Sequence, residues 1–273
     1  MQAASRESYA AAGQRLDAYA RDAEASRIAA TGDEIGTVAG VLRREPRLRR
    51  ALSDPARSGE DRAALLDALL GDKIGADAKE LLGVLATGRW SAPSELLEAT
   101  ERLGVEALLA SSDRAGDLGE VEDELFRFGQ VVAADPELSN VLSDPIAPVA
   151  QRAELTGSLL SGKASAVTIR LVEVALAGFG GRSFTGSLTR LVELAADRRD
   201  RQVAYVTVAA PLTEEEEQRL GSKLTELYGR EVTVKQTVDP AVLGGLSVQI
   251  GSDLYDGTIL RRLTDTRNAL AKR

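Results

Sequence analysis

The strongest constraint on the fold of this chain is an internal repeat. The tetrapeptide LSDP begins at Leu52 and again at Leu142, an offset of 90 residues. At this same offset, and without a gap, many further acidic, basic, proline and apolar positions coincide. They pair Asp33 with Asp123, Glu34 with Glu124, Val41 with Val131, Pro46 with Pro136, Leu48 with Leu138, Arg62 with Arg152, Leu65 with Leu155, Leu69 with Leu159 and Leu81 with Leu171. Such a series indicates a duplicated domain.

Each copy has the apolar periodicity of short α-helices. Alanine and leucine favour helix, and only 4% of the residues are aromatic, so the cores are built from Ala, Leu and Val. Ser58 followed by Asp61 has the spacing of a helix N-cap, and Pro148 is typical of a first helical turn. Further helices are predicted at 77–85, 94–110, 166–177 and 187–198. Five or six helices in each copy predict a small bundle.

The last seventy residues change character. The β-branched segment 202–210 predicts a strand, and Thr213 then begins a helix with glutamates in its first turn and Gly229 at its end. Strands are predicted at 231–238 and 246–250, followed by a short strand and a final helix. The fold class is therefore mainly α, with two tandem six-helix-type bundles followed by a small α+β C-terminal domain. The predicted boundaries are 1–112, 105–200 (sharing the segment from Gly104 to Leu118) and 201–273.

Composition argues against several functions. The 273 residues include no cysteine and no histidine, which removes thiolate and imidazole metal ligands and the commonest general base. The net charge of −8 argues against nucleic-acid binding, and the basic run from Leu42 to Arg50 is interpreted as a solvated helix end. No apolar run is long enough to span a bilayer and the N-terminus has no signal-peptide core, which predicts a soluble intracellular protein with no direct membrane insertion.

The segment from Val238 to Leu263 is rich in glycine and aspartate, and two interpretations compete for it. A phosphate-binding loop is disfavoured because neither Walker nor Rossmann spacing occurs, and Gly244-Gly245 precedes a strand. A metal site at Asp253 and Asp256 lacks a third ligand. Turn and cap chemistry explains the same residues: Gly244 and Gly245 allow a positive φ or a close backbone approach before the strand, and either Asp256 or Thr258 can cap the last helix. We therefore expect no catalytic residue, no cofactor and no metal.

The same segment resembles the C-terminal signature of the delta subunit family of F-type ATP synthases, whose mitochondrial counterpart is the oligomycin-sensitivity-conferring protein. The matching residues are Asp239, Pro240, Gly244, Gly245, Gly251, Asp256, Gly257, Thr258, Arg262 and Leu263. The segments PLTEEE and YGREV and the opening helix around Tyr9 are also similar. Two bundles in place of one resemble the longer delta form of some high-GC bacteria.

This resemblance implies a non-catalytic stator subunit. It implies one copy per complex, linking the α/β catalytic head to the C-terminal end of the b stalk subunits and resisting rotor torque during proton-driven ATP synthesis at the cytoplasmic face of the bacterial plasma membrane. A bundle groove would hold an N-terminal helix of the α subunit. The candidate groove residues are Tyr9, Leu16, Leu82, Leu85 and Trp90 in the first copy and Leu108, Val172, Leu176 and Phe179 in the second.

Alternatives remain at this point. Each groove candidate can instead be a core residue of its own bundle. One bundle alone can hold an α-subunit helix while the other contacts the stalk or another subunit. For the whole chain, the rival functions are a freestanding helical adaptor unrelated to ATP synthesis and, more remotely, a hydrolase that uses carboxylates.

Overall fold

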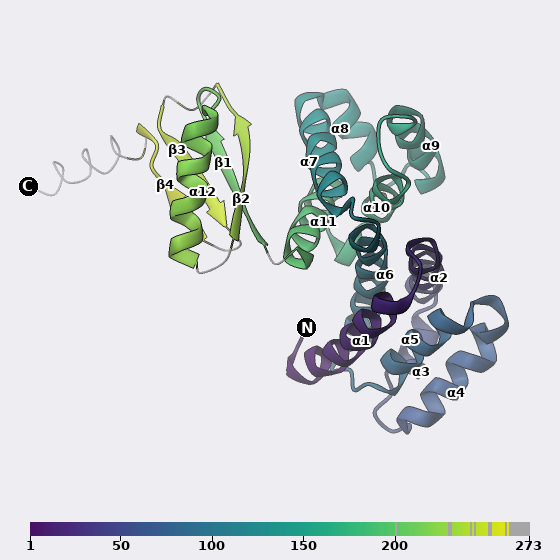
Figure 1. Cartoon of the computed structure of the whole chain (residues 1–273). Helices are drawn as coiled ribbons and strands as arrows, with labels where there is room; N and C mark the ends of the chain where they lie inside the picture. Colours follow the sequence, from purple (N-terminus) through teal and green to yellow (C-terminus); the bar gives the residue numbers. More distant parts are fainter. Residues whose placement is uncertain are drawn as a thin grey trace, which may run out of the picture. The chain divides into compact units, whose positions relative to one another are not determined.

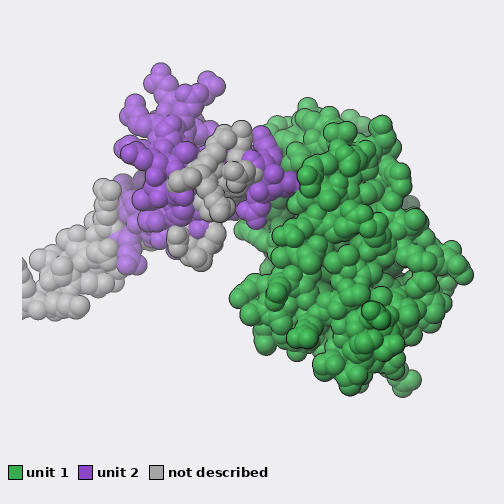
Figure 2. Space-filling model, turned by 60° about the horizontal axis from the view of Figure 1, so that its bottom comes forward, with its two compact units in different colours: residues 1–195 green, residues 196–273 purple. Residues whose placement is uncertain are grey.

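The chain folds into two compact units, Met1–Ala195 and Ala196–Arg273 (Figure 2). The computed structural model describes residues 1–199, 201–228, 231–240, 242, 244–250, 253–259 and 261. Within these ranges, no helix combines the length and the apolar character needed to cross a membrane.

The first unit is helical throughout, as the periodicity predicts (Figure 1). Its earlier elements are α1 (Ala3–Asp22), α2 (Ala25–Arg44), α3 (Pro46–Leu52), α4 (Gly59–Leu70), the 3-10 turn η1 (Gly71–Lys73), α5 (Ala76–Thr87) and α6 (Pro93–Ala115). Its later elements are α7 (Leu118–Ala134), α8 (Pro136–Ser143), α9 (Val149–Leu160), α10 (Ala166–Leu176), the 3-10 turn η2 (Phe179–Gly181) and α11 (Phe184–Arg198), whose last turn continues into the second unit.

The helix boundaries follow the offset of the sequence repeat. Helix α9 begins 90 residues after Gly59, the start of α4, and α10 begins 90 residues after Ala76, the start of α5. Helix α6 likewise begins 90 residues after Ala3, the start of α1. It packs against α1, α2, α3 and α5 and also against α7 and α10. The division of this unit into two bundles stays a prediction.

Local capping chemistry sets several helix ends. The Ser58 hydroxyl accepts a hydrogen bond from the Asp61 amide at 3.0 Å, which confirms the predicted N-cap of α4. Pro148 is itself the N-cap of α9, one position before the predicted first turn, because its extended ψ of 132° precedes the first helical residue. Helix α6 runs past the predicted end to Gly116, whose φ of 84° supplies a left-handed C-cap.

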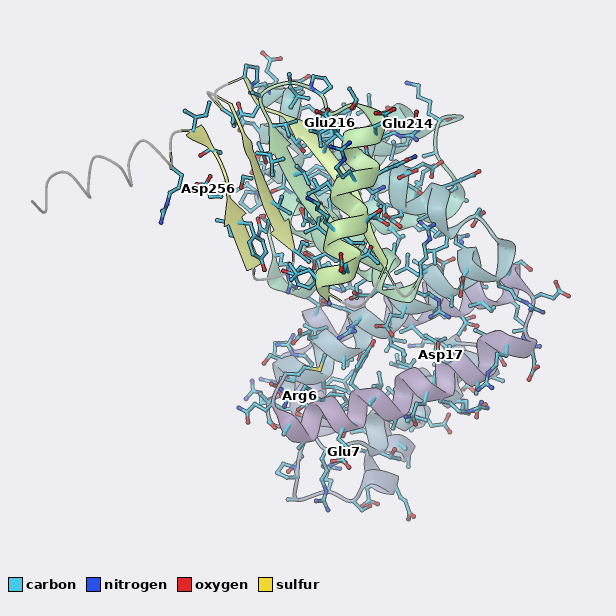
Figure 3. All side chains as sticks on the ribbon, turned by 60° about the vertical axis from the view of Figure 1, so that its left-hand side comes forward. Arg6, Glu7, Asp17, Glu214, Glu216 and Asp256 are labelled. Atoms are coloured by element: carbon cyan, nitrogen blue, oxygen red, sulfur yellow. The ribbon has the colours of Figure 1, made fainter. Side chains whose placement is uncertain are left out.

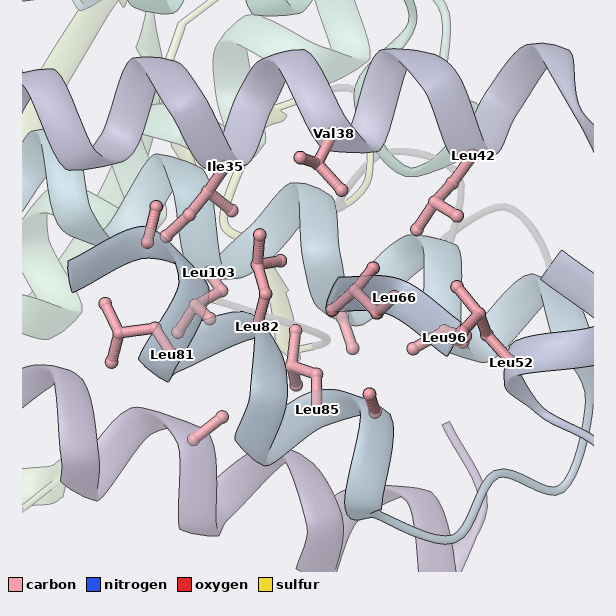
Figure 4. Close-up of a cluster of buried hydrophobic side chains, with 14 of the residues drawn as sticks. Ile35, Val38, Leu42, Leu52, Leu66, Leu81, Leu82, Leu85, Leu96 and Leu103 are labelled. Carbon is pink, nitrogen blue, oxygen red and sulfur yellow. The ribbon is translucent and has the colours of Figure 1, made fainter. Parts of the chain in front are cut away.

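The core of the earlier helices is a continuous cluster of buried aliphatic side chains (Figure 4). Ile35 and Leu103 are fully buried, and leucines of α5 fill the space between α1 and α6. These side chains recur at spacings of three and four residues along each helix, as an amphipathic stripe requires. Burial of such stripes is what stabilises helices too short to be stable alone.

Helices α2 and α6 cross closely at the point where Gly32, Gly36 and Gly104 meet. A Cβ atom on Gly104 would lie 3.3 Å from the Gly32 carbonyl oxygen and 3.3 Å from the Gly36 amide nitrogen. A Cβ on Gly32 would lie 3.1 Å from the Gly104 carbonyl oxygen. In contrast, a Cβ on Gly36 would meet nothing within 4 Å. The crossing therefore requires the absence of a side chain at Gly32 and Gly104 only.

We expect Gly104→Val to lower the free energy of unfolding by about 2–3 kcal/mol, because the added methyl groups force the two helices apart. The control is Gly36→Ala, one turn after Gly32 on α2. This substitution should raise the free energy of unfolding by about 0.5–1 kcal/mol through helix propensity alone. Urea unfolding measures both, and equal effects of the two substitutions would contradict the close crossing.

In the described part of the second unit, helix α12 packs against a four-stranded sheet (Figure 1). Its elements are β1 (Arg201–Val208), α12 (Glu214–Tyr228), β2 (Glu231–Val238), β3 (Leu246–Ile250) and β4 (Asp253–Asp256). The strand order is β2-β1-β3-β4, with β1 parallel to β2 and antiparallel to β3. Val206 lies opposite Val248, and both pack toward Leu224 of α12. Strand β1 ends two residues before the predicted Ala210, in a bend that precedes Pro211.

The start of α12 is a complete capping box. The Glu216 amide donates to the Thr213 hydroxyl at 3.3 Å, and the Thr213 amide donates to the Glu216 carboxylate at 2.9 Å. The Thr213 amide and the Thr213 hydroxyl both donate to the Glu216 carboxylate, and these two hydrogen bonds lower the pKa of Glu216. Glu214 and Glu216 both lie at this end of the helix (Figure 3), where negative charge is favourable. The predicted C-cap, Gly229, lies outside the described residues.

Candidate interaction surfaces

The nine predicted groove residues are all buried. Leu16 and Val172 are fully buried, and the most exposed of the nine, Tyr9 and Trp90, are 8% exposed. Tyr9, Leu16, Leu82, Leu85 and Trp90 belong to one continuous core. The alternative interpretation, burial within the chain's own helices, therefore describes their position. Any partner helix would contact the exposed side chains that cover these nine residues, and not the nine residues themselves.

Two of these residues make further contacts, one through a polar end and one through the face of its ring. The Trp90 indole donates to the Leu85 carbonyl oxygen at 2.8 Å, so its ring is held by the end of α5. The Arg102 guanidinium lies 4.7 Å from the centroid of the Tyr9 ring, a cation–π contact between α1 and α6. Burial raises the pKa of the Tyr9 phenol, and the negative charge of Glu106 raises it further. Tyr9 therefore stays neutral and acts as a packing residue.

A cleft in the helical unit lies between α2 and α10, with α6 as its floor. Its volume is about 530 Å³. In Figure 1 the three helices meet near the middle of the unit. Of the nine candidates, Leu108 lines this cleft. Gly36 and Gly40 keep the α2 wall low, and Val174 and Ala177 form the α10 wall.

Charged side chains cross this cleft at two points. Arg170 of α10 pairs with Asp33 of α2 at 3.3 Å. At the other point Glu101 of α6, which is 7% exposed, accepts from Arg43 at 2.7 Å and from the Gly180 amide at 2.9 Å. Arg43 also donates to the Ala177 carbonyl oxygen. The buried carboxylate thus ties α2, α6 and the turn after α10 to one another.

Burial changes the pKa values of Glu173 and Asp33, the two carboxyl groups beside Arg170. Burial raises the pKa of Glu173, and the nearby Asp33 charge raises it further, while Arg170 lowers it. Burial likewise raises the pKa of Asp33, and Arg170 lowers it. A carboxyl whose pKa is raised on folding contributes stability below its unfolded pKa and loses that contribution as the pH rises through the folded pKa.

Glu173→Gln should therefore be more stabilising at about pH 7 than at about pH 4, because only the native glutamate becomes charged across that interval. Since Glu173 is largely exposed, the difference should stay under about 1 kcal/mol. Thermal unfolding across this pH range measures it. Glu226→Gln, an exposed position on α12, is the control. If the difference in stability between Glu173→Gln and the wild-type chain does not change with pH, the raised pKa of this carboxyl is contradicted.

Glu34 and Glu124, which the sequence repeat pairs, make the same kind of contact at the start of a helix. Glu34 accepts from the Gly75 amide at 2.8 Å, at the start of α5. Glu124 accepts from the Ser165 amide at 3.0 Å, at the start of α10. The two donors, Gly75 and Ser165, are also 90 residues apart. The matched acids in the sequence were the signal for this shared helix-start contact. No matched pair of residues in the sequence indicated the contact between Arg43 and Glu101.

The glycines of the C-terminal signature form a close backbone crossing. Gly244 and Gly245 have φ values of 133° and 81°, which confirms the predicted positive φ. A Cβ on Gly245 would lie 2.5 Å from the Gly257 carbonyl oxygen. The Gly257 amide donates to the Leu246 carbonyl at 3.0 Å, and the Ile259 amide to the Gly244 carbonyl at 2.9 Å. The signature therefore joins the start of β3 to the chain after β4.

Its polar residues complete the turns at both ends. The Asp239 amide donates to the Val208 carbonyl at 2.8 Å, which joins the end of β2 to the end of β1. The Thr258 amide donates to the Asp256 carboxylate at 3.0 Å, and hydrogen bonds from the Thr258 side chain and amide lower the pKa of Asp256. The Arg261 amide donates to the Thr258 hydroxyl at 3.3 Å, which agrees with the predicted cap. Gly251, Arg262 and Leu263 lie outside the described residues.

Comparison with known proteins gives the family of the chain. Residues 105–270 match the family described as ATP synthase delta (OSCP) subunit. The chain belongs to this family. A protein of Salinispora arenicola named ATP synthase subunit delta is 74% identical over 274 residues, covering both chains completely. The proteins of the same name from Streptomyces griseus and Frankia alni are 44% and 40% identical, with 99% and 100% of this chain covered.

Family membership makes this delta subunit a stator component of the F-type ATP synthase. It is a structural subunit and is not itself catalytic. The freestanding adaptor is therefore not favoured. As part of the complex it is peripheral to the membrane. The full-length agreement with relatives of similar size also shows that the longer form is shared, although the family match begins only at residue 105.

Proposed function

We propose that this delta subunit links the α/β catalytic head to the end of the b subunits of the peripheral stalk, as one copy per complex at the cytoplasmic face of the plasma membrane. The observation that carries the proposal is the family match over the later helices and the α+β unit. Several modest contacts on one chain raise the effective concentration of each, which suits a connector under torque.

The helical unit would supply two copies of one bundle, α1–α6 and α6–α11, with α6 common to both. The recurring helix starts and the paired Glu34 and Glu124 contacts support this division. Most of the second copy, from residue 105 onward, lies within the family match, which supports its correspondence to the single bundle of the shorter form. The first copy is the additional part.

One copy would hold an N-terminal helix of the α subunit, lying over the buried groove residues. In the first copy this surface is the seam between α1 and α5, where Arg15 pairs with Glu80. In the second copy the matching seam is between α6 and α10, where the position of Glu80 is taken by Arg170. The second unit would meet the end of the b subunits.

The absence of cysteine allows this to be tested in the intact chain. Glu80→Cys and Arg170→Cys, each carrying an environment-sensitive dye, report on the two matched seams during titration with a peptide of the α-subunit N-terminus. We expect one label to respond with saturation and the other to stay unchanged. Equal, tight responses from both would contradict the single-groove proposal, and no response from either would contradict the α-helix partner.

The wider proposal is tested by isolating the complex. A tagged delta chain should retain α, β and b subunits in the same detergent-solubilised assembly. A chain that purifies free of all three would support the adaptor instead.

A further inference from the structure

A corner of the helical unit exposes apolar side chains. It consists of the end of α8, the turn that follows and the start of α9. Ile146 is 90% exposed, Val141 is 49% exposed and Val149 is 42% exposed. These three residues define the apolar corner. A single exposed apolar residue needs no explanation, but three within nine residues on one corner form a patch typical of interaction sites.

The turn holds Ile146 in its exposed position. The Ile146 amide donates to the Asp144 carboxylate at 2.8 Å. Arg152 of α9 donates to the Leu142 carbonyl oxygen at 2.8 Å, and Leu142 is fully buried. The backbone on both sides of Ile146 is therefore anchored, and a partner would meet a surface that is already formed.

Apart from the buried Arg152, the charged residues along this corner are acidic. From Phe128 to Gln151 the sequence contains no lysine or arginine, and its charged residues are Asp135, Glu137 and Asp144. Asp135 caps α8 by accepting from the Glu137 amide at 3.0 Å. Glu137 is exposed on the first turn of the same helix. An apolar centre with an acidic rim is complementary to a partner that is apolar and basic.

The matched corner of the earlier helices shows that the fold does not require this surface. At the offset of 90 residues, Ile146 corresponds to Ala56, Val141 to Ala51 and Glu137 to Arg47. That corner instead carries four exposed arginines, Arg44, Arg47, Arg50 and Arg57. Helices of matching position thus present opposite charge and different hydrophobicity. Figure 1 shows α8 and α9 at one end of the helical unit and α3 and α4 at the other.

We propose that the apolar corner is a docking surface for a basic amphipathic segment of another protein in the assembly. The partner would place apolar side chains on Ile146, Val141 and Val149 and lysine or arginine toward Glu137 and Asp135. The inference rests on the stator function but adds a contact outside the α-helix seam between α6 and α10.

The test introduces a photocrosslinking amino acid at Ile146 in the intact ATP synthase, with the matched Ala56 as control. We expect a product from Ile146 whose partner peptide contains apolar residues flanked by lysine or arginine. Glu137→Arg, which gives this corner the residue of its matched position, should lower the yield about tenfold through charge repulsion. Because Glu137 and Ile146 are exposed, both variants should keep the wild-type melting temperature.

Three outcomes would overturn the proposal: a yield at Ile146 no higher than at Ala56, a partner peptide with net negative charge, or crosslinking to a second copy of this chain. Co-purification of the α, β and b subunits is measured on the same samples. Intact assembly without an Ile146 product rejects the docking surface alone, whereas failure of the wild-type chain to assemble rejects the proposed function.

Discussion

Gly245→Ala should unfold much of the α+β unit while leaving the helical unit intact. The residue has a φ of 81°, and its new Cβ would lie 2.5 Å from the Gly257 carbonyl oxygen and 3.0 Å from the Thr258 Cα. Both obstacles are backbone atoms, so no side chain can rotate away. Positive φ and backbone displacement together should lower the free energy of unfolding of this unit by about 3 kcal/mol or more. That is a large share of the stability of a small domain.

Amide hydrogen exchange distinguishes the two units in one sample. Gly245→Ala should increase exchange along β1 and β3, whereas amides of α6 should keep their protection. The control is Gly221→Ala on α12, where the new Cβ would lie 3.5 Å from the Val232 carbonyl oxygen, an ordinary contact. We also expect the Gly245→Ala chain to lose the b subunits on purification. Unchanged exchange along β1 would show that the crossing tolerates a side chain.

Local chemistry was the part of the fold that the sequence predicted well. The caps at Ser58 and Thr213 and the positive φ of Gly244 and Gly245 depend on neighbouring residues, and short patterns record them. The repeat offset likewise relates the starts of α9 and α10 to those of the earlier helices. Strand and helix ends differed by a few residues where a bend or a C-cap decided them.

Long-range pairing left little trace in the sequence. Gly32 and Gly104 are far apart in the chain yet meet at one crossing, and Glu101 joins Arg43 to a turn that comes much later. Neither contact follows from periodicity, because helical spacing defines a face without naming its partner. The groove residues show the same limit. Leu16 and Val172 satisfy an apolar stripe equally well as core residues or as a groove lining, and only burial distinguishes the two.

The matched copies also separate fold from function. Arg62 and Arg152 are both buried and both donate to backbone carbonyls near the LSDP segments, so the repeat preserves them as structural residues. Arg47 and Glu137 occupy matched surface positions with opposite charge. A difference at an exposed position costs the fold little, which leaves such positions available for different partners.

Arg62→Ala should destabilise the helical unit far more than the loss of a surface charge. Arg62 is 4% exposed, and its guanidinium donates to five carbonyl oxygens, those of Asp54 (3.0 Å), Arg57 (3.3 Å), Ala86 (2.9 Å), Thr87 (3.1 Å) and Gly88 (2.7 Å). Alanine would leave these acceptors without their donor, and we expect a loss of about 3–5 kcal/mol. Arg62→Lys should restore only part of it, because an ammonium cannot reproduce the planar fork.

The matched residue provides the control for this prediction. Arg152 donates to Leu142 through one nitrogen, while its Nε atom is buried without a hydrogen-bond partner. Arg152→Ala should therefore cost less, about 1–3 kcal/mol. The single tryptophan, Trp90, lies in the core next to Gly88 and Arg89, so urea unfolding followed by its fluorescence reports on the Arg62 network directly. A larger loss from Arg152→Ala than from Arg62→Ala would show that the number of carbonyl contacts does not determine the stability of these two sites.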